Sequence, residues 1–177
     1  LHVAMARDVS EVCKRGEVAL RWSIDGDLSH PWVSNLEGPV GIQARGDLGD
    51  RLVSALGAKG VALGCDSPTL PTALLRQATA CEAPVILGPS FDGGCWCIGW
   101  NQPCPEIFEN IPWSTSQVMA ELVLRVRALG LDCEILPYWY DVDEPSDVDF
   151  LRTHLGILPE HCGRHSRHFF QSIKGGA

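Results

Sequence analysis

Short apolar runs alternate along the chain with segments in which apolar residues recur at helical spacing. Runs rich in β-branched, aromatic or small apolar residues are typical of strands, and those without interspersed polar residues are typical of strands buried on both faces. These runs predict strands over residues 17–23, 60–64, 83–89, 95–100 and 133–137.

The segments with helical spacing carry start and stop signals at their ends. Asp47 precedes an apolar helical face and Gly57 follows it, which indicates a capped helix over residues 47–56. Ser114 opens a Ser-Thr-Ser-Gln sequence with the form of a capping box, and Gly130 is the stop signal of the helix that follows. Further helices are predicted over residues 1–13, 71–81 and 146–156.

The alternation of strands with helices predicts an α/β fold, with a mostly parallel sheet and helices on both of its faces. No internal repeat or long linker divides the sequence, so we expect a single domain over residues 1–177, in which 156–177 form a C-terminal tail. Because the chain opens within an amphipathic helical pattern, we expect it to start after its fold has begun.

Composition and charge narrow the class of protein. Hydrophobic residues make up 45% of the chain and charged residues 20%, as in globular proteins. No apolar run approaches the ~20 residues that cross a bilayer, so no membrane span is expected. The net charge of −8 argues against a nucleic-acid partner. Eight scattered cysteines without a Cys-x-x-Cys pair favour reduced thiols and a cytoplasmic location.

Acidic residues follow three of the predicted strands. Asp66 follows the second strand, Asp92 the third, and Asp141 and Asp143 the fifth. Ligands of open α/β sheets bind at the carboxyl ends of strands, so these carboxylates are expected on one rim. Mg²⁺ commonly takes one or two carboxylates together with substrate phosphates. Taken singly, each aspartate also fits a helix or turn cap, but three coincident strand ends favour a metal site.

Two loops carry further groups suited to a ligand. Gly93 and Gly94 allow positive φ and a close approach of a ligand to the backbone, although a simple turn between two strands would also accept them. Gln43 lies in a loop that runs through Gly46 into the helix at Asp47, and its amide offers both a donor and an acceptor.

Five sequence motifs occur in a defined order over roughly residues 40–155: QARGDLGDRL, VALGCDSPTLP, VILGPSFDGGCWCIG, IPWSTSQVM and YDVDEPSDV. Together they resemble the bacterial family of glycosyltransferase-A-like proteins, mostly uncharacterised, within the nucleotide-diphospho-sugar transferase superfamily. The resemblance implies a Rossmann-like GT-A fold that binds a nucleotide sugar or nucleotide donor with Mg²⁺ or Mn²⁺. A small-molecule acceptor would be the second substrate, and the oligomeric state stays open.

The resemblance also implies roles for individual residues. By position, Asp66 and Asp143 would be metal ligands, and Asp92 would be the candidate base on the acceptor side. The implied donor contacts are Gln43, Gly46, Asp47, Ser67, Gly93 and Gly94. The implied acceptor side comprises Trp113, Ser114 and Thr115.

The chain departs from the family pattern at two points. Cys95-Trp96-Cys97 stands where relatives have aromatic residues after the double glycine. Relatives also begin with a strand and a Gly-, Lys- and Arg-containing phosphate loop that nothing in this chain matches, so we expect a domain without that first strand and loop. The leading hypothesis is a metal-dependent glycosyltransferase. Nucleotidyl transfer of the guanylyltransferase type and a non-catalytic nucleotide-binding descendant are the alternatives.

Overall fold

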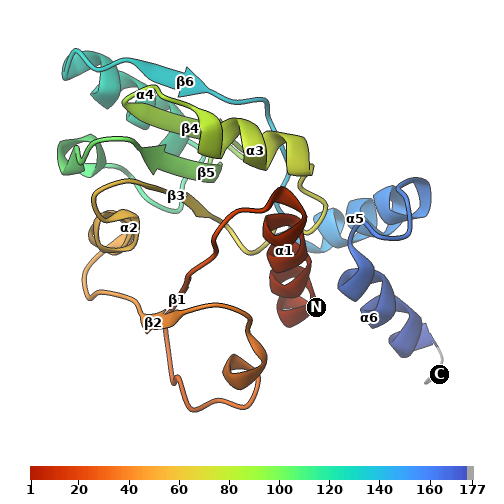
Figure 1. Cartoon of the computed structure of the whole chain (residues 1–177). Coiled ribbons are helices and arrows are strands. Elements are labelled where there is room, and N and C mark those ends of the chain that lie inside the picture. The colour runs from red at the N-terminus through yellow and green to blue at the C-terminus, as the bar shows by residue number, and fades with distance from the viewer. Residues whose placement is uncertain (175–177) are drawn as a thin grey trace.

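The computed structural model describes residues 1–174, and its centre is a four-stranded sheet (Figure 1). The strands are β3 (Gly60–Leu63), β4 (Val85–Pro89), β5 (Cys95–Trp100) and β6 (Cys133–Ile135), in the spatial order β3-β5-β4-β6. β4 and β6 pair in parallel, whereas β5 is antiparallel to both of its neighbours. β3, β4 and β6 therefore run in one direction. β5 opposes them because a short turn returns the chain directly from β4.

A second, two-stranded sheet lies apart from the first, with β1 (Trp22–Ile24) and β2 (Val40–Ile42) paired in parallel. The segment between them, which includes η1 (Val33–Asn35), projects away from the central sheet (Figure 1). β3 forms one edge of the central sheet, so it is half-buried along its length in place of the full burial that its apolar sequence predicts.

Helices form at each of the predicted positions, and one more forms in the tail. They are α1 (His2–Gly16), α2 (Leu48–Leu56), α3 (Thr72–Ala80), α4 (Val118–Ala128), α5 (Pro145–Ile157) and α6 (Arg164–Lys174). Asp47 and Gly57 bound α2 as predicted. Among residues 1–174 no helix has the length and apolar character needed to cross a membrane.

The capping box predicted at Ser114 is wrong. Ser114 has a φ of 62°, and α4 begins after it, with Gln117 at the N-cap position. The Thr115 hydroxyl donates to the Pro112 carbonyl at 2.7 Å and accepts from the Gln117 N–H at 3.3 Å. These local hydrogen bonds form a turn that competes with the helix, as Ser and Thr side chains often do.

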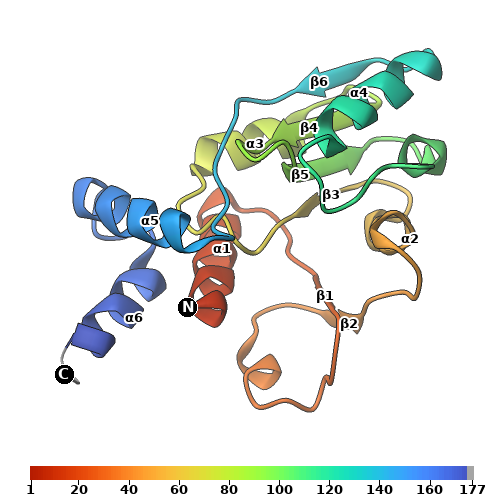
Figure 2. The ribbon, with the colours of Figure 1, turned by 180° about the vertical axis from the view of Figure 1, so that it is seen from behind.

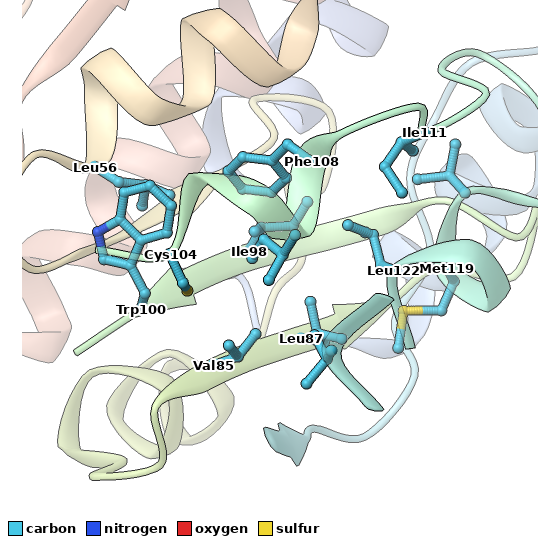
Figure 3. Packing of buried hydrophobic residues seen from close by; sticks show 13 residues of the cluster. Leu56, Val85, Leu87, Ile98, Trp100, Cys104, Phe108, Ile111, Met119 and Leu122 are labelled. Atoms are coloured by element: carbon cyan, nitrogen blue, oxygen red, sulfur yellow. The ribbon is translucent and has the colours of Figure 1, made fainter. Parts of the chain in front are cut away.

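Helices cover both faces of the central sheet, and Figures 1 and 2 show the two sides. α2, α4 and the short η2 (Pro105–Phe108) pack on the face that presents Val85 and Leu87 (Figure 3). α1 and α3 pack on the other face, against Ile86 and Trp96. Successive residues of β4 therefore enter different hydrophobic clusters, which explains why the whole strand is apolar. The eight cysteines are free thiols.

A buried carboxylate joins α1 to the C-terminal helix α6. Asp8, which is 2% exposed, accepts hydrogen bonds from the N–H groups of His165 and Ser166 at 2.8 and 2.9 Å and from the Ser166 hydroxyl at 2.7 Å. N–H groups in the first turn of a helix have no partner within that helix. Asp8 therefore caps α6 from another helix and fixes the tail to the domain.

We predict that Asp8→Ala lowers the free energy of unfolding by about 1–3 kcal/mol, because the α6 donors lose their acceptor in a buried setting. Urea denaturation followed by circular dichroism measures this change. Glu11→Ala is the matched control, since it removes the solvent-accessible Glu11–Arg164 ion pair on the same two helices, and it should cost below about 1 kcal/mol. Equal losses in the two variants would contradict the capping role of Asp8.

Candidate active site

The pairing of β4 with β6 continues beyond both strands and determines where two aspartates lie. The Trp139 N–H donates to the Pro89 carbonyl at 3.1 Å, and Ser90 pairs with Trp139 in a parallel bridge. Asp92 and Asp141 each follow this bridge by two residues. The bridge therefore delivers both carboxylates to the same rim of the sheet, as expected from the strand ends.

Three carboxylates meet on this rim. One oxygen from each of Asp92, Asp141 and Asp143 lies within 4.8 Å of the others, and we refer to these residues as the carboxylate cluster. Val142 is buried between the last two, which leaves its acidic neighbours on the rim. The sequence placed all three at strand ends but assigned Asp141 no role. The Asp-x-Asp spacing around an apolar residue is the signal that could have identified it.

The turn between β4 and β5 holds Asp92 in place. Its Oδ1 accepts from the Ser90 hydroxyl at 2.5 Å and from the Gly94 N–H at 2.8 Å. Gly93 has a φ of 92°, and a Cβ at this position would collide with the Ser116 carbonyl in the turn before α4. Glycine is therefore required for the turn to pack against α4. The ligand contacts predicted for the two glycines stay predictions.

Asp66 lies beside the carboxylate cluster rather than within it. Its carboxylate folds back over Gly64, where a Cβ would collide with Asp66 Oδ1. The next residue, Ser67, is 1% exposed and donates its hydroxyl to the Tyr140 carbonyl at 3.0 Å. Ser67 thus ties the Asp66 loop to the segment that carries Asp141. The metal contact of Asp66 and the donor contact of Ser67 stay predictions.

Burial and repulsion by neighbouring carboxylates raise the pKa values of Asp141, Asp143 and Asp66. Desolvation, followed by the charge of Asp92, raises the pKa of Asp141 to about 6. Desolvation also raises the pKa values of Asp66 and Asp143, and the charges of neighbouring aspartates add to both shifts. A bound cation would reverse this repulsion. Carboxylate oxygens are the ligands that Mg²⁺ and Mn²⁺ take in proteins, so this donor set fits either ion.

Contacts with the first turn of α2 fix the conformation of the loop that carries Gln43. Gln43 Oε1 accepts from Arg51 Nη1 at 3.2 Å. Gly46 has a φ of 117°, and Asp47 forms a reciprocal capping box with Asp50. These contacts hold the loop in place without involving a ligand, and the donor contacts predicted for Gln43, Gly46 and Asp47 stay predictions.

The predicted acceptor side lies in the turn before α4. The Trp113 ring packs against Phe108 with ring centroids 6.0 Å apart, and its indole N–H is buried without a hydrogen-bond partner in the part of the chain that the structure describes. Ser114 and Thr115 are exposed. The ring thus belongs to the core, while the two hydroxyl residues face solvent, and their contact with an acceptor stays a prediction.

The fold is similar to two solved structures. One is a "putative nucleotide-diphospho-sugar transferase" from Desulfovibrio desulfuricans G20, with a TM-score of 0.81, 24% identity and coverage of 98% of this chain and 84% of that chain. The other is CMP:2-keto-3-deoxy-manno-octonic acid synthetase complexed with CTP, with a TM-score of 0.63, 12% identity and coverage of 86% of this chain and 87% of that chain. The expected α/β nucleotide-diphospho-sugar transferase fold is confirmed.

Sequence comparison gives the family. No curated protein matches the chain. The bacterial family described as "Uncharacterized protein conserved in bacteria (DUF2064)" matches residues 9–115, a span that includes Asp66 and the Asp92-Gly93-Gly94 turn. Since this match covers more than half of the 177 residues, the chain belongs to that family.

Proposed function

We propose that the chain is a metal-dependent transferase that uses a nucleotide-activated donor, with glycosyl transfer as the leading reaction. The observation that carries the proposal is the carboxylate cluster, which gathers three acidic groups at the strand ends where α/β sheets bind ligands. The fold shared with a protein described as a nucleotide-diphospho-sugar transferase supports the class of donor.

In this proposal the rim residues divide into metal ligands and one base. Asp141 and Asp143 hold Mg²⁺ or Mn²⁺, with Asp66 as the predicted additional ligand. When bound, the cation neutralises charge on the leaving diphosphate. Asp92 Oδ1 is occupied by Ser90 and Gly94, so Oδ2 is the oxygen that takes a proton from the acceptor hydroxyl.

Nucleotidyl transfer is the second candidate, favoured by the similarity to a synthetase complexed with CTP. The two reactions break different bonds. Glycosyl transfer breaks the bond between the sugar carbon and the diphosphate and releases a nucleoside diphosphate. Nucleotidyl transfer breaks the bond between the α- and β-phosphates and releases pyrophosphate. Product analysis with nucleotide sugars and nucleoside triphosphates therefore distinguishes them, and binding without product would indicate the non-catalytic alternative.

We predict that Asp141→Asn weakens Mn²⁺ binding by more than about tenfold, because a neutral amide replaces a charged oxygen ligand. Isothermal titration calorimetry with Mn²⁺, alone and with nucleotides and nucleotide sugars, measures this affinity. Glu160→Gln is the control, since it removes one exposed carboxylate outside the rim and should leave the affinity unchanged. Unchanged binding by Asp141→Asn would exclude the cluster as the metal site.

The role of Asp66 is tested in the same titrations. We predict that Asp66→Ala also lowers Mn²⁺ affinity, because the residue lies close enough to Asp143 and Asp92 for their charges to raise its pKa. A variant that binds Mn²⁺ as tightly as the wild type would remove Asp66 from the ligand set and leave the cluster itself as the site.

The raised pKa of Asp141 predicts a pH-dependent stability in the metal-free protein. The folded state holds the Asp141 proton more tightly than the unfolded chain, so this residue stabilises most at low pH and loses that contribution as pH rises through about 6. Asparagine cannot ionise. Asp141→Asn in EDTA should therefore unfold at a higher temperature than the wild type at about pH 7.5, and by a smaller margin at about pH 5. A margin that does not change with pH would contradict the assignment.

A further inference from the structure

An apolar groove of about 500 Å³ runs along α4 beside the edge strand β6. Met119, Ala120, Val123 and Leu124 line it from α4, and Ile135 lines it from β6. These α4 positions recur three and four residues apart, so they form one stripe along the helix. Leu124 and Ile135 are exposed although both are large and apolar, so the groove presents apolar surface to solvent.

The two ends of the groove differ in chemistry. At one end lies Gly93, the residue after Asp92. The Gly93 carbonyl accepts a hydrogen bond from the Met119 N–H at 2.9 Å. At the other end lies Arg127, the charged residue of the lining. The eight steps from Met119 to Arg127 span about 12 Å of helix at a rise of 1.5 Å per residue. The groove therefore extends from the residue that follows Asp92 to a cation, in a chain whose net charge is −8.

Tyr138, one of the lining residues, stacks on Phe91, the residue before Asp92. Phe91 and Tyr138 stack with their centroids 5.6 Å apart and an interplanar angle of 25°. They are 73% and 56% exposed, and Tyr138 lines the groove while Phe91 directly precedes Asp92. Such a stack offers a flat apolar surface at the point where a ligand in the groove would reach the cluster.

We propose that this groove binds the acceptor, and that the acceptor is a small amphipathic acid. Its elongated apolar body lies along α4, its anionic group pairs with Arg127, and its hydroxyl end reaches past the Phe91–Tyr138 stack to Asp92. The reaction at Asp92 rests on the proposed function, whereas binding in the groove requires neither metal nor donor.

The test uses 10-hydroxydecanoate as the probe, with the full chain kept in EDTA. We expect saturable binding with one site per chain by isothermal titration calorimetry. Ala120→Trp fills the groove from an exposed helix position and should weaken binding by about tenfold or more. Ala128→Trp, at an exposed position of the same helix outside the groove, should bind like the wild type. No saturable binding, or equal losses in the two variants, would overturn the proposal.

The role of Arg127 is tested by charge. Arg127→Gln should weaken binding of 10-hydroxydecanoate by about tenfold and leave 1,10-decanediol unaffected, because the diol carries no anion. Lys59→Gln, which removes an exposed positive charge elsewhere, should affect neither ligand. Equal losses for the acid and the diol would overturn the assignment of the anionic end.

The orientation of the probe follows from nuclear Overhauser effects. We expect nuclear Overhauser effects between the methylenes at the hydroxyl end of the probe and the rings of Phe91 and Tyr138. Effects between these rings and the carboxylate end would overturn the proposed orientation. Sedimentation then excludes another occupant: a wild-type dimer that Ala120→Trp dissociates would identify the groove as a subunit interface and overturn the proposal. The metal site and the groove are tested independently with Asp141→Asn. If this variant loses Mn²⁺ binding but still binds the probe, the groove does not depend on the metal site, and failure of either proposal leaves the other intact.

Discussion

The positions of the carboxylate cluster depend on a parallel pairing of β4 with β6 that continues beyond the end of β6. β6 ends at Ile135, opposite Leu87, yet the chain continues beside β4 as far as the Ser90–Trp139 bridge. Between these two paired positions, the segment after β6 contains one residue more than the segment of β4 that it faces. Pro137 lies in this stretch, where it has no N–H to donate, and its carbonyl accepts from the buried Trp96 indole at 3.1 Å. A shift of one residue in this register would put Val142 in the place of Asp141 and Asp143 in the place of Val142, so an apolar side chain would turn outward and a carboxylate inward.

Tyr140 extends this constraint to the neighbouring loops. Its carbonyl accepts from Ser67, and its hydroxyl accepts from Thr69 at 2.6 Å and lies 2.9 Å from His154 Nδ1. Burial lowers the pKa of His154, which favours the neutral ring, whose unprotonated nitrogen can accept a hydrogen bond from the Tyr140 hydroxyl. One residue thus joins the Asp66 loop, the segment of the carboxylate cluster and α5. The acidic groups are held by a network that makes little use of the carboxylates themselves.

Sequence reasoning succeeds here where the signal is local and fails where it is tertiary. Asp47 and Gly57 lie next to the helix that they bound, and β4 is apolar on both faces because both faces are covered, so each could be predicted. The burial of β3 depends on its place at the sheet edge, and α6 is capped by an aspartate more than a hundred residues earlier. The convergence of Asp92 and Asp143 was predictable from strand ends alone, whereas Asp66 lies beside them. The distance of Asp141 from Asp92 could be read only from the continued pairing of the two segments after β4 and β6.

The helix-cap explanation of the acidic residues can be weighed against the structure. α3 begins after Pro71, and Glu144 with Asp147 forms the capping box of α5, so neither Asp66 nor Asp143 is the cap of the helix that follows it. Asp92 does stabilise its own turn, but with one of its two oxygens. Asp141 and Asp143 face like charges in a partly desolvated setting that raises their pKa values. A structural role would not require this repulsion, whereas a cation-binding role would, because the same closeness that destabilises the empty site strengthens binding of a divalent ion.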